Sequence, residues 1–250
     1  MLIAEDLALL LFDDDALAPV SGAANLEYSL AGALLIELAV RDRIDVAPGA
    51  LADTAPGALA DTAGQTGGDG GARAEGPGPE ALVVLDAEST GISVLDGALT
   101  TVAERAGAKP TDALGALAGR TPSAELLAGL ADRGILRRAD GRIAGRAPTE
   151  DWAEQDLEHG RHVRAELHRV LVEGGEPDER TTALIALLTG TDTVARVLGA
   201  EADPAEVKRR ADRIAEGNRA RDALREPVEK ITAAVVAALF VPTLVTPPTP

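Results

Sequence analysis

Histidine and carboxylate side chains gather in one stretch of the sequence at a spacing that metal sites use. His159 and His162 lie three residues apart, with Glu158 and Glu166 beside them. One face of a helix would then present imidazole and carboxylate groups together. The remaining histidine, His168, is six residues beyond His162 and falls on another face. Because surface histidines are far commoner on helices than zinc ligands, we expect no metal and no cofactor.

Arginine is the second residue type here that can bind a ligand. The segment from Arg133 to Arg146 carries five arginines against Asp132 and Asp140: Arg133, Arg137, Arg138, Arg142 and Arg146. Guanidinium groups bind phosphate oxygens, and near an anionic membrane each contributes about 1 kcal/mol. An ordinary solvated hairpin, whose charges prevent edge-to-edge aggregation, explains the same residues. Both interpretations remain open from the residues alone.

No arrangement of residues indicates catalysis. The chain has no cysteine, which excludes disulfides, thiolate metal ligands and cysteine nucleophiles together. A Ser–His–Asp group or a carboxylate pair cannot be placed. The glycines at positions 67, 68, 70 and 71 lack the Lys-Ser/Thr ending of a phosphate-binding loop. We therefore expect a protein that is not an enzyme.

The charge balance limits the partners. The formal net charge is −17 at pH 7, so we expect no nucleic-acid partner, because phosphate contacts supply most of the non-specific affinity of such proteins. Binding to an anionic membrane must come from a local basic patch. The partners that the sequence leaves open are anionic phospholipid headgroups and a protein, including a second copy of the chain.

The sequence also predicts where the protein works. Its first basic residue is Arg41, so a positively charged secretory signal is not expected. The longest apolar run, residues 231–241, is about half of the roughly 20 residues that a transmembrane helix needs. Basic positions are mostly arginine, which suggests a GC-rich bacterial genome. We expect a cytoplasmic protein that is at most peripheral on the inner face of a membrane.

The elements that position these residues are predicted to be mainly helical. Hydrophobic residues make up 46% of the chain and aromatic residues only 2%, so the core must consist of leucine, alanine, valine and isoleucine, which favours helices. Asp178 and Thr191 are predicted to cap two helices. Helices are predicted at residues 2–12, from 25, 95–105, from 110, 122–133, 152–173, 181–188, 194–198, 204–225 and 227–240.

Two short β-hairpins complete a single globular helical domain over residues 1–242, with a Pro-rich tail at 243–250. Residues 44–46 are predicted to pair with 81–85, and 135–144 to form a hairpin around Asp140-Gly141, a type I′ turn signature. Between the first pair lies a Gly/Ala/Pro-rich insertion at 47–80, predicted to be disordered. Within it PGALADTA at 48–55 is repeated letter for letter at 56–63.

Four segments of the sequence resemble one known family in collinear order. They are NLEYSLAGALLIELAVRDRIDV at 25–46, TGISVLDGA at 90–98, LLAGLADRGIL at 126–136 and DERTTALIALL at 178–188. With their spacing they cover most of the chain outside the insertion and the tail. The pattern is similar to that of the Golgi phosphoprotein 3 family. The resemblance implies a mainly helical fold with phosphatidylinositol 4-phosphate bound on one face.

The resemblance also implies where a headgroup would bind. Members of the family build the pocket from a tryptophan and an arginine near the first long helix and two arginines three residues apart. The corresponding positions here are Gly22, Ala31, Arg120 and Ser123, so most of the pocket is absent and Arg120 remains. It joins the five arginines of the hairpin as a candidate lipid or phosphate contact.

The sequence therefore predicts a non-enzymatic peripheral membrane or adaptor protein of this family. Eukaryotic members sit on the Golgi and tether the tails of glycosyltransferases. The alternative is a protein–protein scaffold without lipid affinity, which would associate through the hairpin or through the helix at 208–225. That helix alternates basic and acidic residues, and a salt-bridged solvent face is the interpretation that we favour for it.

Overall fold

Helices form most of the computed structural model, which describes residues 1–11, 23–48, 80–139, 142–146, 154–199, 203–217 and 226–240. Within these residues the chain forms ten helices and two pairs of antiparallel strands. The prediction of a mainly helical fold with two small hairpins is confirmed. The helices are α1 (Ile3–Leu11), α2 (Ala23–Val40), α3 (Ser93–Ala103), α4 (Pro110–Ala118), α5 (Pro122–Asp132), α6 (Glu154–Leu171), α7 (Glu179–Gly190), α8 (Val194–Leu198), α9 (Pro204–Gly217) and α10 (Glu226–Phe240).

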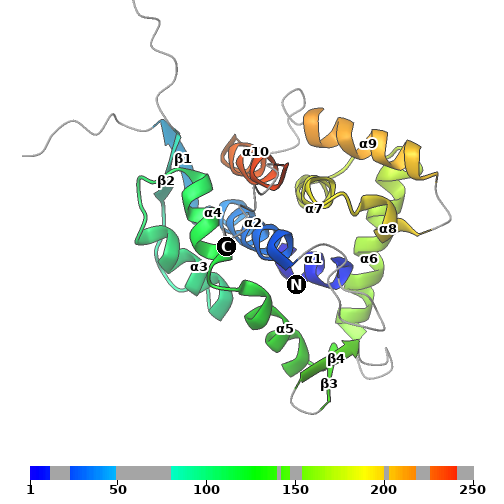
Figure 1. Cartoon of the computed structure of the whole chain (residues 1–250), viewed down its shortest axis with the longest axis horizontal. Coiled ribbons are helices and arrows are strands. Elements are labelled where there is room, and N and C mark those ends of the chain that lie inside the picture. Colours follow the sequence, from blue (N-terminus) through cyan, green and yellow to red (C-terminus); the bar gives the residue numbers. More distant parts are fainter. Residues whose placement is uncertain are drawn as a thin grey trace, which may run out of the picture.

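Helix α2 forms the centre of the fold, with α1, α4, α5, α7 and α10 packed around it (Figure 1). Leu30, Leu34 and Leu38 recur every four residues and are buried. Leu35 and Ile36 are equally buried, so α2 is covered on more than one side. A helix that is apolar all round lies inside the core.

A close helix contact in the core joins α2 to α10. A Cβ atom at Gly32 of α2 would lie 2.3 Å from Cγ1 of Val235, a buried residue of α10. Only glycine leaves room for this approach. The contact fixes α10 directly on the central helix.

Strands β1 (Ile44–Pro48) and β2 (Glu80–Val84) form the first hairpin, with Ile44 opposite Val84 and Pro48 opposite Glu80. The predicted pairing is confirmed. The strands take in positions 47, 48 and 80 of the predicted insertion, while residues 49–79 lie outside the described part of the chain. The tail at 243–250 lies outside it too.

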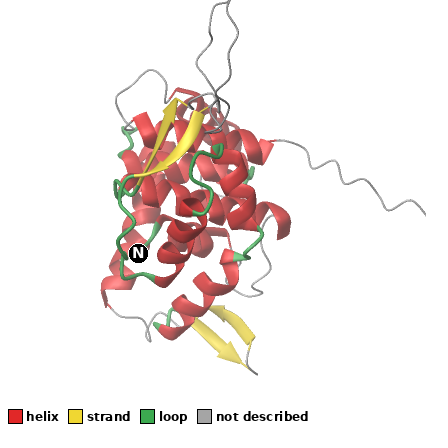
Figure 2. Ribbon diagram, turned by 90° about the vertical axis from the view of Figure 1, so that its left-hand side faces the viewer, coloured by secondary structure: helices red, strands yellow, loops and turns green. Residues whose placement is uncertain are grey.

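Strands β3 (Leu136–Ala139) and β4 (Arg142–Arg146) form the second hairpin, in which Leu136 lies opposite Arg146. The predicted turn at Asp140-Gly141 lies outside the described residues. Figure 2 shows β3 and β4 at one end of the molecule and β1 and β2 at the other. The β3–β4 hairpin extends beyond the helices that precede and follow it.

The predicted cap of α7 is confirmed and that of α8 is wrong. The Asp178 side chain accepts a hydrogen bond of 2.7 Å from the backbone N–H of Thr181. Thr191 instead ends α7, because its hydroxyl donates to the carbonyls of Leu187 and Leu188. Thr193 precedes α8 and makes no side-chain cap.

Replacing Asp178 with alanine is expected to lower the free energy of unfolding by about 1 kcal/mol near neutral pH, because α7 loses its N-cap. Burial acts to raise the pKa of Asp178, but the Thr181 hydrogen bonds and the charges of Arg180 and His162 outweigh it and leave that pKa below its ordinary value. A lowered folded-state pKa contributes stability above the unfolded-state pKa, and the contribution is lost as pH falls through the folded-state pKa.

Urea denaturation of the wild type and Asp178→Ala at several pH values tests this. The difference between them should hold from neutral pH to about pH 5 and shrink below about pH 4. Asp178→Asn, which retains a capping oxygen without the charge, should keep most of the stability but lose this pH dependence. If the stability difference between the wild type and Asp178→Ala stays constant below pH 4, the Asp178 carboxylate is not the cap of α7.

Candidate functional site

The N-terminus of α5 is where the sequence placed the remaining headgroup arginine, and a carboxylate of the protein already lies there. Glu27 of α2 accepts hydrogen bonds from the hydroxyl and the backbone N–H of Ser123, the latter at 3.2 Å. Thr121 precedes the helix with a left-handed φ of 53° and makes no side-chain cap. Because helix N-termini attract anions, Glu27 supplies from α2 the negative charge that α5 would otherwise take from a ligand.

Arg120 lies in the turn between α4 and α5 and is exposed. Its Nη2 is 3.7 Å from the position of a Cβ atom on Gly97, so its guanidinium lies over α3. It forms no ion pair with any residue that the structure describes. This arginine is therefore available to an anion from solvent.

The other headgroup-pocket positions taken from the family resemblance do not form a pocket with Arg120 among the described residues. Ala31 is fully buried in α2, so that position faces the core and not a ligand. Gly22 lies outside the described residues. Ser123 is beside Arg120 in sequence but is bonded to Glu27. The described part of the chain thus brings Arg120 and Glu27 to the start of α5, whose first turn also carries Glu125. We name Glu27, Arg120 and Ser123 the α5 N-terminal site.

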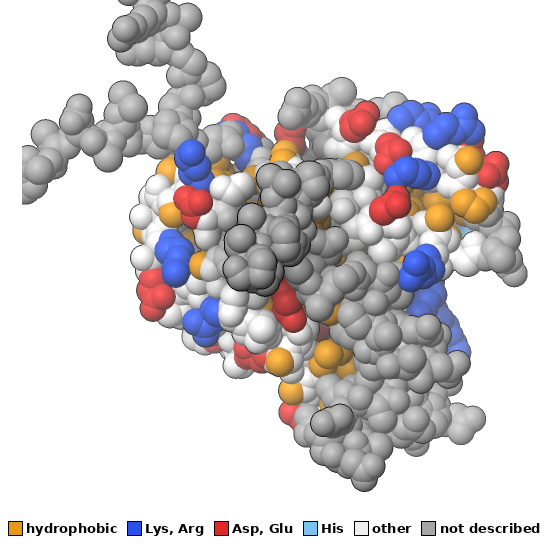
Figure 3. All heavy atoms as spheres, in the orientation of Figure 1, with side chains coloured by type: hydrophobic (Ala, Val, Ile, Leu, Met, Phe, Trp, Pro, Cys, Tyr) orange, Lys and Arg blue, Asp and Glu red, His pale blue; other side chains and the backbone are white. Residues whose placement is uncertain are grey.

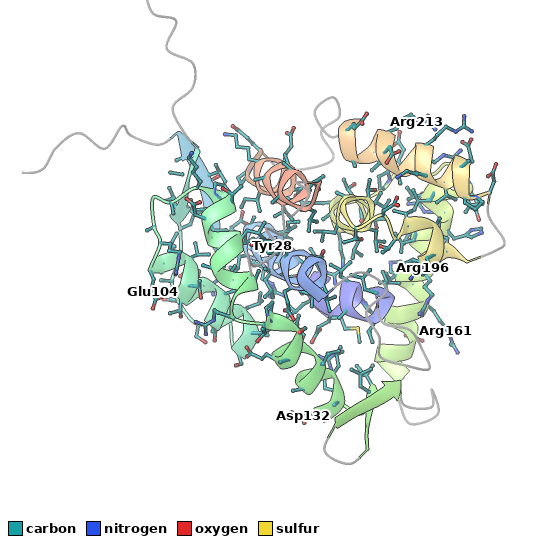
Figure 4. The ribbon with its side chains drawn as sticks, viewed as in Figure 1. Tyr28, Glu104, Asp132, Arg161, Arg196 and Arg213 are labelled. Carbon is teal, nitrogen blue, oxygen red and sulfur yellow. The ribbon has the colours of Figure 1, made fainter. Side chains whose placement is uncertain are left out.

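Tyr28 is a residue at the same junction that the sequence analysis missed. It follows Glu27 on α2 and is 37% exposed. Its hydroxyl oxygen is 3.9 Å from the position of a Cβ atom on Gly115 in α4, and Figure 4 labels it near the centre of the molecule. Its status as the only tyrosine was a signal, since aromatic rings with a polar tip suit membrane interfaces.

Arg133 does not project freely from the second hairpin. It follows the last residue of α5, and its Nη1 lies 2.7 Å from Oε1 of Glu5 in α1, a nearly buried carboxylate. Arg137 and Arg138 are on β3, and Arg142 and Arg146 are on β4. The hairpin thus carries four of the predicted arginines, while Arg133 joins α5 to α1.

The ion pair of Arg133 belongs to a wider buried network at the N-terminal end of the chain. Asp6 of α1, whose side chain is 2% exposed, is 2.5 Å from Arg180 of α7 and 2.9 Å from His159 of α6. Glu37 of α2 accepts the backbone N–H of Ile3 and pairs with Arg41 at 2.8 Å. Arg180 also approaches Glu37 at 3.7 Å. The polar contacts of Asp6, Glu37, His159 and Arg180 thus connect the four helices α1, α2, α6 and α7.

The network explains one of the histidines singled out in the sequence. His159 points to Asp6, and His168 lies on another part of α6, 3.2 Å from Glu173. Within the described residues no group of three histidine, aspartate or glutamate side chains is placed to bind a metal ion. His159 connects helices and does not share a ligand site with His168.

The charges of α9 are largely satisfied on the protein surface. Arg209 pairs with Glu206, Lys208 lies 2.8 Å from Asp192, and Arg210 donates to the carbonyls of Leu171 and Val172. Figure 3 shows basic and acidic side chains side by side over this helix, at the upper right. This is the salt-bridged face that the sequence favoured, within residues 204–217.

Comparisons with known sequences give a family but no individual relative. The family model described as Golgi phosphoprotein 3 matches residues 3–231, which include every described helix except the C-terminal part of α10. Comparison with curated proteins finds no significant match. Among the described residues, the helices all fall short of the length or apolarity needed to cross a bilayer.

Proposed function

This chain belongs to the Golgi phosphoprotein 3 family, and on that premise we propose that it is a non-enzymatic adaptor that docks on anionic lipid surfaces by charge. Family membership supports the adaptor role. The lipid contacts in this proposal are Arg120 and the hairpin arginines Arg137, Arg138, Arg142 and Arg146. The protein would then be cytoplasmic and peripheral on the inner face of a membrane.

The exposure of Arg120 at the α5 N-terminal site carries the proposal. Arg120 is exposed and has no ion-pair partner among the described residues, so it can approach a phosphate. Glu27 takes the Ser123 N–H and adds a negative charge. A headgroup pocket needs several donors directed at one phosphate, and this site offers one arginine, which lies over α3, while Glu27 already takes the Ser123 N–H. That supports attraction to a charged surface and not selection of one phosphoinositide.

The position of the second hairpin supports the same conclusion. It lies at one end of the molecule (Figure 2), so a flat surface can reach it without meeting the helical core. Each arginine near an anionic membrane contributes about 1 kcal/mol. In a chain with a net charge of −17, such a local basic segment would also orient the protein, since the rest of its surface is repelled.

Vesicle sedimentation tests the proposal with three lipid compositions: phosphatidylcholine alone, phosphatidylcholine with phosphatidylglycerol, and the latter with phosphatidylinositol 4-phosphate. We expect binding to the anionic vesicles at low salt and its loss at high salt. At matched surface charge, phosphatidylinositol 4-phosphate should give no further gain. Arg120→Ala should weaken binding by about fivefold, the equivalent of about 1 kcal/mol.

Arg209→Ala is the matched control, because Arg209 is also exposed but pairs with Glu206 on α9. It should bind vesicles as the wild type does. Binding that ignores salt, or no binding to anionic vesicles, would overturn the proposal. If light scattering also showed an oligomer that Arg137→Glu and Arg138→Glu dissociate, the scaffold function would replace it.

A further inference from the structure

The outer side of α6 carries a second group of arginines, which the lipid-docking proposal does not use. Arg161 and Arg164 are exposed and lie three residues apart on this helix, so they are neighbours on one face. The buried residues Val163, Leu167 and Val170 come from the opposite face. The two guanidinium groups therefore point away from the core.

Helix α8 adds a third arginine to this side of the molecule. It packs against α6 (Figure 1), and its Arg196 is exposed. Figure 4 labels Arg161 and Arg196 at the same edge of the molecule. Figure 3 shows basic side chains gathered at that edge, below α9, with no acidic side chain among the coloured atoms between them. We name Arg161, Arg164 and Arg196 the α6–α8 basic patch.

The charges of Arg161 and Arg164 stand out because most basic side chains of this acidic protein are paired. Acidic residues outnumber basic ones by 41 to 24, and Arg196 has an interaction partner within the protein. Four described basic side chains form no ion pair or hydrogen bond with another described residue: Lys109, Arg120, Arg161 and Arg164. Two of these four lie one turn apart in the patch.

The acidic residues of α6 do not neutralise this pair. Side chains on a helix meet three or four residues apart. At those distances from Arg164 the sequence has no acidic residue, and from Arg161 it has Glu158 alone. Glu158 is exposed and forms no ion pair within the described residues. Like charges one turn apart destabilise a helix, so an anionic partner would relieve a repulsion that is built into α6.

The shape of the patch indicates a flat partner. Its arginines stand on the outer side of α6, which is convex, whereas a peptide bound to a folded domain is usually held in a groove or added to a sheet edge. An anionic bilayer needs neither, because its surface potential attracts arginines that lie within a Debye length of it. A convex basic helix face thus fits a membrane surface better than an acidic peptide.

The patch is also close in sequence to the β3–β4 hairpin, which the proposed function places on a membrane. Strand β4 ends at Arg146 and α6 begins at Glu154, so only residues 147–153 separate the two elements. Figure 1 shows the start of α6 at the end of the molecule that carries β3 and β4. One planar surface can therefore reach both the hairpin and the outer side of α6.

We propose that the α6–α8 basic patch is a second contact of the membrane-docking surface, so that an anionic bilayer meets the hairpin and the outer side of α6 together. This inference rests on the proposed function. A single contact at the hairpin leaves the protein free to rotate about it, whereas a second contact on α6 fixes which side of the molecule faces the lipid. Arg161 and Arg164 supply the free charge of that contact.

Vesicle sedimentation of the full chain at low salt, with phosphatidylcholine–phosphatidylglycerol vesicles, tests the inference. Arg161→Ala/Arg164→Ala should weaken binding by about thirtyfold, since each arginine near an anionic surface contributes about 1 kcal/mol. Arg137→Ala/Arg138→Ala should weaken it by a similar factor. The variant with all four substitutions should lose the product of the two factors, because both contacts meet one surface.

Arg209→Ala/Arg213→Ala is the matched control. It removes the same charge from two arginines that are 70% and 69% exposed on α9, but both lie within ion-pair distance of Glu206. Its binding should stay close to that of the wild type. Alanine is a better helix former than arginine, so circular dichroism should show unchanged helix content in each of these variants.

The outcomes separate this inference from the proposed function. If the wild type does not bind anionic vesicles, the proposed function falls and the inference falls with it. If the wild type binds and Arg137→Ala/Arg138→Ala weakens binding while Arg161→Ala/Arg164→Ala does not, the inference alone falls. Equal losses in Arg161→Ala/Arg164→Ala and Arg209→Ala/Arg213→Ala would reduce the effect to net charge and overturn it.

Two further results would assign the patch elsewhere. If Arg161→Ala/Arg164→Ala keeps vesicle binding but loses binding to soluble poly-glutamate, the patch serves an acidic protein and not a membrane. If that variant binds vesicles as the wild type does, and Glu150→Gln/Asp151→Asn strengthens binding only while both arginines are present, the chain's own segment 147–153 neutralises them.

Discussion

Arg180→Met is expected to lower the free energy of unfolding by about 3 kcal/mol, because breaking a buried ion pair leaves an uncompensated charge. Asp6 is almost fully buried and would keep only His159 as a partner. Glu37 would also lose its second arginine. Methionine fills a similar volume, so the loss would report the charge and not a cavity. For a chain of this size the melting temperature should fall by roughly 6–12 °C.

Thermal and urea denaturation measure this effect, with Arg209→Met as the control. Arg209 is 70% exposed and pairs with Glu206 within α9, so its loss should change stability by less than about 1 kcal/mol. Asp6→Asn removes the carboxylate that pairs with Arg180. The double variant Asp6→Asn/Arg180→Met should therefore be less destabilised than the sum of the two single variants. Equal losses at Arg180 and Arg209 would contradict a role for the buried network.

Gly32→Leu is expected to destabilise the protein by about 3 kcal/mol, the upper end of the usual range for overpacked cores. A single added Cβ would already lie 2.3 Å from Cγ1 of Val235. That side chain is 1% exposed, and a β-branched residue in a helix has one strongly preferred rotamer, so it cannot turn aside. Leucine favours helix over glycine by less than about 1 kcal/mol, which is too little to offset the collision.

Gly129→Leu is the matched control, since it makes the same change in the middle of a helix where nothing lies within 4 Å of the added Cβ. It should leave stability unchanged or raise it by up to about 1 kcal/mol. Adding Val235→Ala to Gly32→Leu should recover part of the loss. If Gly32→Leu and Gly129→Leu unfold at the same urea concentration, the close contact of α2 with α10 does not limit stability.

The fold followed from the sequence where the signals are local. Asp178 precedes an apolar run and caps α7, and the apolar residues on either side of the insertion pair as β1 and β2. The burial of α2 on every side from Ser29 to Ala39 was not predicted. Leu34, Leu35 and Ile36 follow one another and so lie on three different sides of the helix. Hydrophobic periodicity alone cannot tell which of these sides other helices cover.

The side-chain pairs of the candidate site could not be predicted from the sequence, because the paired residues are far apart along the chain. Arg133 was found by its place in a basic cluster, but Glu5, which pairs with it, is 128 residues away. Glu27 and Ser123 are separated by 96 residues. Side-chain type and local spacing identify charged residues, whereas only the packing of α1, α2 and α5 decides which of them neutralise one another.

The first hairpin bears on how the repeated octapeptide can vary among relatives. Pro48 and Glu80 are opposite each other, so the two ends of the segment between them are held side by side at any segment length. Doubling the length of a closed loop adds only about 0.6 kcal/mol of entropy. Gain or loss of one PGALADTA copy is therefore nearly neutral for stability, and the copy number can drift. The same junction would accept an inserted peptide tag.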